Sequence, residues 1–218
     1  MKIKISPSIL AGDFANLGRD TKRISESGAD FVHIDVMDGN FVPNLTIGPE
    51  VIKAIKPYSS IPFDVHLMIE SPEIFVDDYI NAGADIITFH LEASKDPHAT
   101  ISLIKSKGIK AGISLMPKTE AEDIFEFLES IDLVLIMTVE PGFGGQRFME
   151  NQLKKISKIS KKAARLKKDI IISVDGGIND ATARLAIENG ANMLVSGSWL
   201  FKQPSIEKAV LDLKKIIC

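Results

Sequence analysis

The chain has 218 residues, 45% of them hydrophobic, which is enough to bury a full core. Because no low-complexity or Ser/Pro-rich linker divides it, we expect one domain over residues 1–218. Its formal net charge of −3 argues against nucleic-acid binding, since neutralising phosphates requires a basic surface. The only cysteine is Cys218, which excludes a disulfide framework and a cysteine metal site within the chain.

Strand-like and helical segments alternate along the whole chain. Runs rich in Ile, Val and Phe predict strands near 3–9, 30–36, 61–67, 85–90, 109–115, 132–139, 169–175 and 192–196. Stretches of helical period follow them at 17–24, 51–55, 74–80, 101–104, 121–128, 153–166, 181–187 and 206–217. Glycines 28, 83, 108 and 190 lie between helix and strand, where a left-handed cap is needed. Eight such units predict a closed (β/α)8 barrel.

The alternative fold is an open doubly wound sheet, which also alternates strands and helices. No G-x-G-x-x-G motif follows the first strand, where Ser6-Pro7-Ser8 stands instead. Candidate functional residues also end at least six different strands, as barrel enzymes require because their sites form at the C-terminal rim. The sequence therefore favours the barrel.

Two further patterns concern the surroundings of the protein. Residues 1–5 lack the regions of a signal peptide, and no apolar run approaches the ~18 residues that span a bilayer. We therefore expect a cytoplasmic protein that does not bind a membrane. A basic cluster at 154–168 alternates with apolar residues, which is typical of the solvated face of an amphipathic helix. An anionic partner is the other interpretation of this cluster.

Two histidines and two aspartates stand where apolar runs give way to Gly-containing loops: His33, Asp35, His66 and Asp175. Residues two apart in a strand share a face, so His33 and Asp35 point the same way. An isolated H-x-D is more often a satisfied structural group, so the inference depends on all four positions. Together they could form both a metal site and an acid/base pair. This donor set suits Zn²⁺, Fe²⁺, Mn²⁺ or Co²⁺ better than Ca²⁺ or Mg²⁺.

Three late loops contain glycines, at residues 140–146, 175–177 and 196–198. Glycines let backbone N–H groups approach an anion closely. A single glycine pair is more often only a turn, but three at successive late strand ends favour a phosphate site. Residues 198–201 could supply the short extra helix that often completes such a site in barrels.

Over essentially its whole length the chain resembles ribulose-phosphate 3-epimerase. The matching stretches are 6–10, 33–39, 43–44, 66–68, 137–148 and 174–177, and they include H-x-D-x-M-D-G, P-G-F-G-G-Q and D-G-G in the expected order. The resemblance implies a barrel of the ribulose-phosphate-binding type and an isomerase of the pentose phosphate pathway. Such an enzyme interconverts D-ribulose 5-phosphate and D-xylulose 5-phosphate by inverting carbon 3 through an enediolate. Its partner is a small ketose phosphate, and a homo-oligomer is possible.

The resemblance also assigns roles by position. One divalent cation, with Zn²⁺ favoured, is held by His33, Asp35, His66 and Asp175. Asp35 is the proton acceptor and Asp175 the proton donor on the opposite face. Ser8 and His66 match substrate-contacting positions. The phosphate cradle comprises Gly142, Phe143, Gly144, Gly145, Gly176, Gly177, Gly197 and Ser198.

Several nearby residues fall outside this set. His90 and Glu92 do not match ligand positions and are expected to be structural, buried and hydrogen-bonded. Met37, Met68 and Met137 either line the site or pack in the core. Met116 and Trp199 depart from the family pattern, and Trp199 bears on the shape of the phosphate end.

Three other functions compete with this assignment. Allulose-6-phosphate 3-epimerase would share the barrel, the metal and the carboxylates. Metal-free barrels such as orotidine-phosphate decarboxylase need a lysine in D-x-K-x-x-D, but Met37 occupies that place. A non-catalytic sugar-phosphate-binding barrel is the third, although a binder would not need two carboxylates and two histidines.

Overall fold

The computed structural model describes residues 3–216, so Cys218 lies outside the described residues. Within this range eight strands form one parallel sheet. They are β1 (Lys4–Pro7), β2 (Val32–Met37), β3 (Phe63–Met68), β4 (Ile86–His90), β5 (Lys110–Leu115), β6 (Leu133–Met137), β7 (Ile171–Asp175) and β8 (Met193–Ser196). The order β1-β8-β7-β6-β5-β4-β3-β2 means that strands consecutive in sequence are neighbours in space.

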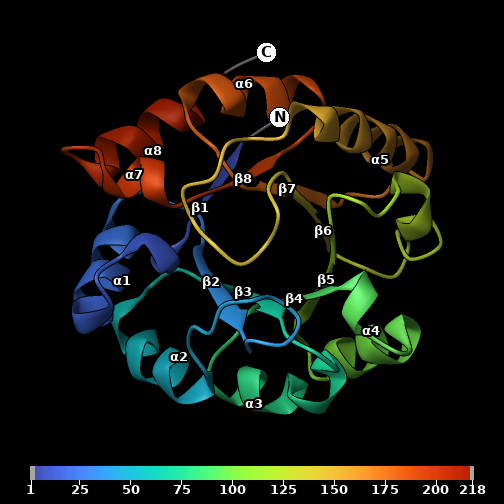
Figure 1. Ribbon diagram of the computed structural model, residues 1–218, viewed down its shortest axis with the longest axis horizontal. Coiled ribbons are helices and arrows are strands. Elements are labelled where there is room, and N and C mark those ends of the chain that lie inside the picture. The colour runs from blue at the N-terminus through green and yellow to red at the C-terminus, as the bar shows by residue number, and fades with distance from the viewer. Residues whose placement is uncertain (1–2, 217–218) are drawn as a thin grey trace.

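The two edges of the sheet meet between β1 and β2. A parallel bridge joins Ser8 to His33, and the Asp30 N–H donates to the Ile5 carbonyl at 2.9 Å. Figure 1 shows the resulting ring of strands with helices around it. The predicted (β/α)8 barrel is confirmed. The doubly wound alternative is wrong, because the strand order of such a sheet reverses at a switch point and the order here does not.

Helices connect successive strands on the outside of the barrel. The α-helices are α1 (Leu17–Glu26), α2 (Pro49–Ile55), α3 (Val76–Asn81), α4 (Pro97–Ser106), α5 (Leu153–Arg165), α6 (Asp180–Glu188), α7 (Ser198–Phe201) and α8 (Ile206–Lys214). Short 3-10 helices are η1 (Ile9–Ala11), η2 (Phe14–Asn16), η3 (Lys56–Tyr58), η4 (Pro72–Ile74), η5 (Leu91–Ala93), η6 (Ala121–Ile124) and η7 (Glu150–Gln152). The predicted short helix at 198–201 is confirmed as α7. In residues 3–216, every helix is too short or too polar to cross a membrane.

The helix predicted at 121–128 is confirmed only over Ala121–Ile124, where it is the 3-10 helix η6. The segment forms η6 and then turns, in which the Phe125 and Phe127 N–H groups bond carbonyls three residues earlier. Ala121, Ile124 and Phe127 are all buried. Their spacing of three residues matches one turn of a 3-10 helix, so this winding buries all three on one face.

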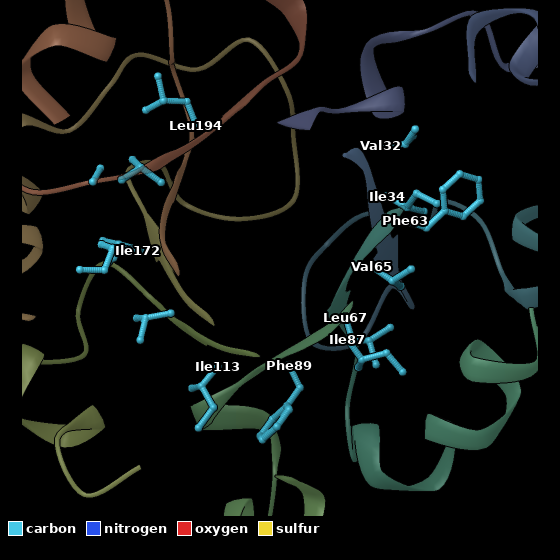
Figure 2. Close-up of a cluster of buried hydrophobic side chains, with 14 of the residues drawn as sticks. Val32, Ile34, Phe63, Val65, Leu67, Ile87, Phe89, Ile113, Ile172 and Leu194 are labelled. Atoms are coloured by element: carbon cyan, nitrogen blue, oxygen red, sulfur yellow. The ribbon is translucent and has the colours of Figure 1, made fainter. Parts of the chain in front are cut away.

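The apolar core lies between the strands and the helices. Figure 2 shows side chains of this layer, among them Val32, Ile34, Phe63, Val65 and Leu67. Burying each large aliphatic or aromatic side chain contributes roughly 1.5–3 kcal/mol. Because side chains alternate along a strand, the residues between them, such as His33 and His66, face the barrel interior. Outward packing in this way sets the direction of the inward polar groups.

The basic residues of α5 were expected to form a solvated face, but one of them, Lys155, is buried. Its neighbours Lys154 and Lys158 are exposed, but Lys155 is only 8% exposed. Its Nζ donates to the carbonyls of Met116 at 2.8 Å and Pro117 at 3.1 Å. A buried ammonium is tolerated because these oxygens replace its water.

Candidate metal centre and active site

A cavity of about 460 Å³ opens where the strands end. In Figure 1 the long connections after β2 and β6 cross the mouth of the barrel. Asp35 and Asp175 line the cavity together with Met37, Met68 and Met137. The three methionines therefore line the site, where their thioethers provide a weakly polar wall.

Four side chains converge below this mouth, within the part of the chain that the structure describes. His33, Asp35, His66 and Asp175 each bring one ligand atom within 4.8 Å of the others. The Asp35 Oδ1 lies 3.2 Å from His33 Nε2 and 3.3 Å from His66 Nδ1. His33 Nε2 is 3.9 Å from Asp175 Oδ2. Both histidines are fully buried, and two imidazoles with two carboxylates could hold a metal ion.

The pairing of β2 with β3 creates this convergence. Their register places His33 opposite Asp64 and Asp35 opposite His66. The H-x-D of one strand thus lies beside a D-x-H of the next, with both pairs facing inward.

Asp64 is a functional candidate that the sequence interpretation missed. Its buried Oδ2 lies 2.7 Å from His33 Nδ1 and accepts a hydrogen bond from Ser6 Oγ at 3.3 Å. A carboxylate at Nδ1 retains the proton there and leaves Nε2 free as a metal ligand. Its position two residues before His66 was the available signal.

The surrounding side chains shift the pKa values of the two aspartates, Asp35 and Asp175, in opposite directions. Burial would raise the pKa of Asp35, but His33 and His66 outweigh it and hold that pKa well below its usual range. Burial and then the Asp35 charge raise the pKa of Asp175 to about 7. Asp35 is therefore the stronger acid of the two and Asp175 the weaker, which is the pattern of an acid/base pair.

The pKa values of the two histidines, His33 and His66, are also shifted in opposite directions. Burial lowers the pKa of His33, but the charges of Asp35 and Asp64 prevail and raise it well above its usual value. Burial dominates at His66 and lowers its pKa to about 4. His66 is thus neutral at physiological pH, the form that ligates metals.

His90 is buried and hydrogen-bonded, as predicted, and it contacts a ligand of the cluster, whereas Glu92 is hydrogen-bonded but not buried. Its Nε2 lies 2.9 Å from His66 Nε2, and its Nδ1 lies 3.3 Å from Glu92 Oε2. Among the described residues, neither His90 nor Glu92 belongs to the metal-ligand group. His98 is exposed, at 60% of its side chain.

Ser8 lies at the junction of the metal group and the cavity. Its Oγ caps η1 by accepting the Leu10 N–H at 3.3 Å, and it donates to Asp35 Oδ2 at 2.6 Å. Ser8 also lines the cavity. A substrate beside Asp35 would therefore lie beside this hydroxyl.

The late glycine loops pack against one another over the cavity. A Cβ on Gly176 would lie 2.6 Å from the Val139 side chain, and one on Gly177 would lie 2.5 Å from the Phe148 nitrogen. Both glycines have positive φ, at 120° and 67°. Any larger residue would force the β6–α5 connection away from β7.

The predicted substrate-binding set lies along one cavity with one exception. Ser8, Asp175 and the eight cradle residues line it, whereas His66 and its neighbour His33 lie beneath. The lining also includes residues without a predicted role: Asn44, Gln146, Asn179, Trp199 and Lys202. The Asn44 side chain donates to the Gly142 carbonyl at 2.7 Å and thereby ties two mouth loops together.

Comparison with known proteins agrees with this geometry. Residues 4–201 match the profile described as "Ribulose-phosphate 3 epimerase family". A ribulose-phosphate 3-epimerase of Bacillus subtilis is 49% identical over 213 residues, covering 97% of this chain and 98% of that protein. The chloroplastic ribulose-5-phosphate-3-epimerase of Arabidopsis thaliana is 49% identical over 214 residues, covering 97% and 76%. Orotidine 5'-phosphate decarboxylase from Pyrococcus horikoshii, at 14% identity, shares the fold with a TM-score of 0.71 over 98% of each chain.

Proposed function

The chain belongs to the ribulose-phosphate 3-epimerase family and is an isomerase, and we propose that its barrel mouth inverts carbon 3 of a ketose phosphate. The substrate pair is D-ribulose 5-phosphate and D-xylulose 5-phosphate. The observation that carries the proposal is the pair Asp35 and Asp175, which line one cavity and belong to the same group of potential metal ligands.

Asp35 and Asp175 perform the two proton transfers. The ionised Asp35 removes the proton from carbon 3 of ribulose 5-phosphate and leaves an enediolate. Asp175 delivers a proton to the opposite face of the same carbon. The reverse reaction exchanges the two roles. Ser8, bonded to the Asp35 carboxylate, holds that group toward the cavity.

His33, Asp35, His66 and Asp175 would hold one divalent cation, with Zn²⁺ favoured and Fe²⁺, Mn²⁺ or Co²⁺ possible. The fit rests on the donor set and on Asp64, which directs His33 Nε2 toward the other ligands. When bound, the cation supplies positive charge to the enediolate oxygens, an effect worth several kcal/mol. The Met37, Met68 and Met137 side chains keep this end of the cavity weakly polar.

The phosphate would lie at the other end, against the late loops. The proposed cradle is formed by backbone N–H groups of the late loops, at Gly142, Phe143, Gly144, Gly145, Gly176, Gly177, Gly197 and Ser198. Gly144 and Gly145 adjoin the Ser198 hydroxyl at the start of α7. Lys202 lines the same end and adds a positive charge.

Replacing Gly177 by alanine tests the cradle. The new Cβ collides with the Phe148 backbone, so we expect KM for ribulose 5-phosphate to rise by about tenfold or more, equivalent to ~1.4 kcal/mol. Gly108→Ala is the matched control, because Gly108 has a similar φ of 76° and nothing within 4 Å of its Cβ. It should lower stability by about 1–2 kcal/mol and leave KM unchanged. Equal KM values in the two variants would remove Gly177 from the cradle.

Cation affinity should weaken as the pH falls below about 7. The raised pKa values of Asp175 and His33 mean that these groups hold protons in that range, and a cation must displace them. Titrations of the metal-free protein with Zn²⁺ at pH 6, 7 and 8, in competition with a chelator of known affinity, measure the trend. An affinity independent of pH would contradict the assignment of these two ligands.

Proton NMR in D₂O tests the function itself. The purified protein should convert D-ribulose 5-phosphate to D-xylulose 5-phosphate with deuterium entering at carbon 3, and chelation should stop both processes. Failure with every divalent metal added would overturn the pentose-phosphate assignment.

A further inference from the structure

A line of hydrogen-bonding side chains runs from the end of β4 to the metal group. Glu92 Oε2 lies 3.3 Å from His90 Nδ1, and His90 Nε2 lies 2.9 Å from His66 Nε2. At the far end, His66 Nδ1 lies 3.3 Å from Asp35 Oδ1. Both imidazoles are fully buried, so their nitrogens depend on these partners.

Hydrogen bonds to one carboxylate oxygen of Glu92 orient the other oxygen, Oε2, toward His90. Its other oxygen, Oε1, accepts the Met116 N–H at 2.9 Å and the Thr119 hydroxyl. Lys155 holds the same loop through the Met116 carbonyl. Burial would raise the pKa of Glu92, but hydrogen bonds from His90 and Thr119 prevail and lower it. Glu92 is therefore a carboxylate, which can accept hydrogen bonds but cannot donate them.

Each proton position along the line then follows from the previous one. A cation held by His66 Nδ1 would leave the ring proton of His66 on Nε2, which then donates to His90 Nε2 at 2.9 Å. His90 in turn carries its proton on Nδ1, where the Glu92 carboxylate accepts it. In this arrangement the lone pair of His66 is on Nδ1, the nitrogen that faces the metal-ligand group.

We propose that Glu92, acting through His90, is a positioning residue that sets the tautomer of His66 for metal binding. It does for His66 what Asp64 does directly for His33. The inference rests on the proposed metal site and adds two residues that do not touch the cation. Partners of this kind typically change metal affinity by about 10- to 100-fold.

Glu92→Gln is the sharpest test, because the amide has the shape of the carboxylate but only one accepting oxygen. If that oxygen stays on the Met116 N–H, the amide donates to His90 Nδ1 and reverses both tautomers. If the amide is rotated by 180°, its oxygen accepts from His90 Nδ1, but its NH₂ group then faces the Met116 N–H, and two donors repel each other. Either outcome weakens the arrangement that His66 needs.

Two controls isolate the effect. Thr119→Val removes the hydroxyl that donates to the Glu92 carboxylate, but Glu92 keeps its charge and its contact with His90. Glu126→Gln makes the same chemical change beside the exposed His98, where the two side chains lie 3.6 Å apart. Neither control should alter the His66 tautomer.

The measurement is two-bond ¹H–¹⁵N NMR of the histidines in the full-length protein, together with Zn²⁺ affinity by chelator competition. We expect His66 and His90 of the Zn²⁺-loaded wild type to carry protons on Nε2 and Nδ1, and Glu92→Gln to change these positions or broaden the signals, with Zn²⁺ bound about 10- to 100-fold more weakly. Unchanged tautomers and affinity would overturn the inference. Absence of Zn²⁺ binding by the wild type would instead refute the metal site, so the two failures are distinguishable.

Discussion

Replacing Asp175 by asparagine is expected to lower the rate of epimerisation by about 10²–10⁴-fold, the contribution of a positioned acid or base. The effect should depend on the direction of the reaction. Asp35 remains, so carbon 3 of ribulose 5-phosphate should still exchange its proton with D₂O, but little xylulose 5-phosphate should form. Starting from xylulose 5-phosphate, exchange should be lost, because Asp175 is the base in that direction.

Asp35→Asn provides the mirror experiment. It should lose exchange from ribulose 5-phosphate and retain exchange from xylulose 5-phosphate. Because both aspartates belong to the metal-ligand group, rates are compared per bound cation, with metal content measured for each variant. Loss of exchange in both directions by both variants, with the cation still bound, would contradict the division of roles.

Removing the divalent cation is expected to lower kcat by ~10³-fold or more. The expectation follows from several kcal/mol of charge stabilisation, at about 1.4 kcal/mol for each factor of ten. Cation binding should also stabilise the fold, by about 2.7 kcal/mol at a free concentration of 100 times Kd. Activity and thermal unfolding are measured after chelation and after Zn²⁺, Fe²⁺, Mn²⁺ or Co²⁺ is restored.

His33→Gln and His98→Gln separate a ligand effect from a general effect of losing a histidine. His33 is buried within the metal-ligand group, whereas His98 is exposed. Restored cation should rescue the chelated wild type and His98→Gln but not His33→Gln. Full activity of the chelated wild type would remove the cation from the mechanism.

Much of the architecture could be predicted because it depends on local patterns. Apolar strand runs, helical periods and the glycines between them predict eight βα units. The structure has all eight strands in that order, with an α-helix after each except β5, which is followed by η6. At 121–128 the helix ends earlier than predicted, at Ile124, because three- and four-residue spacings are hard to distinguish over so few residues. There the core favours the tighter 3-10 winding of η6.

Burial of a charged side chain is also poorly visible in sequence. Lys155 belongs to a basic amphipathic pattern, yet its ammonium meets two carbonyls from residues 116 and 117. The periodicity of the sequence does not predict these hydrogen bonds, because they depend on where α5 packs against the β5–η6 connection. The same holds for Asn44, whose partner Gly142 is 98 residues away.

The amino-acid pattern is enough to show which residue types stand at the strand ends: His33, Asp35, His66, Asp175 and the late glycines. A parallel barrel necessarily brings these ends to one rim, so their convergence could be predicted without coordinates. The tertiary structure alone decided how the imidazoles are oriented. The contacts of Asp64 with His33 and of His90 with His66 arise from strand register and inward packing. The hydrogen-bond partner of a buried nitrogen is set by distances of a few ångströms between different strands, which no local pattern in the chain specifies.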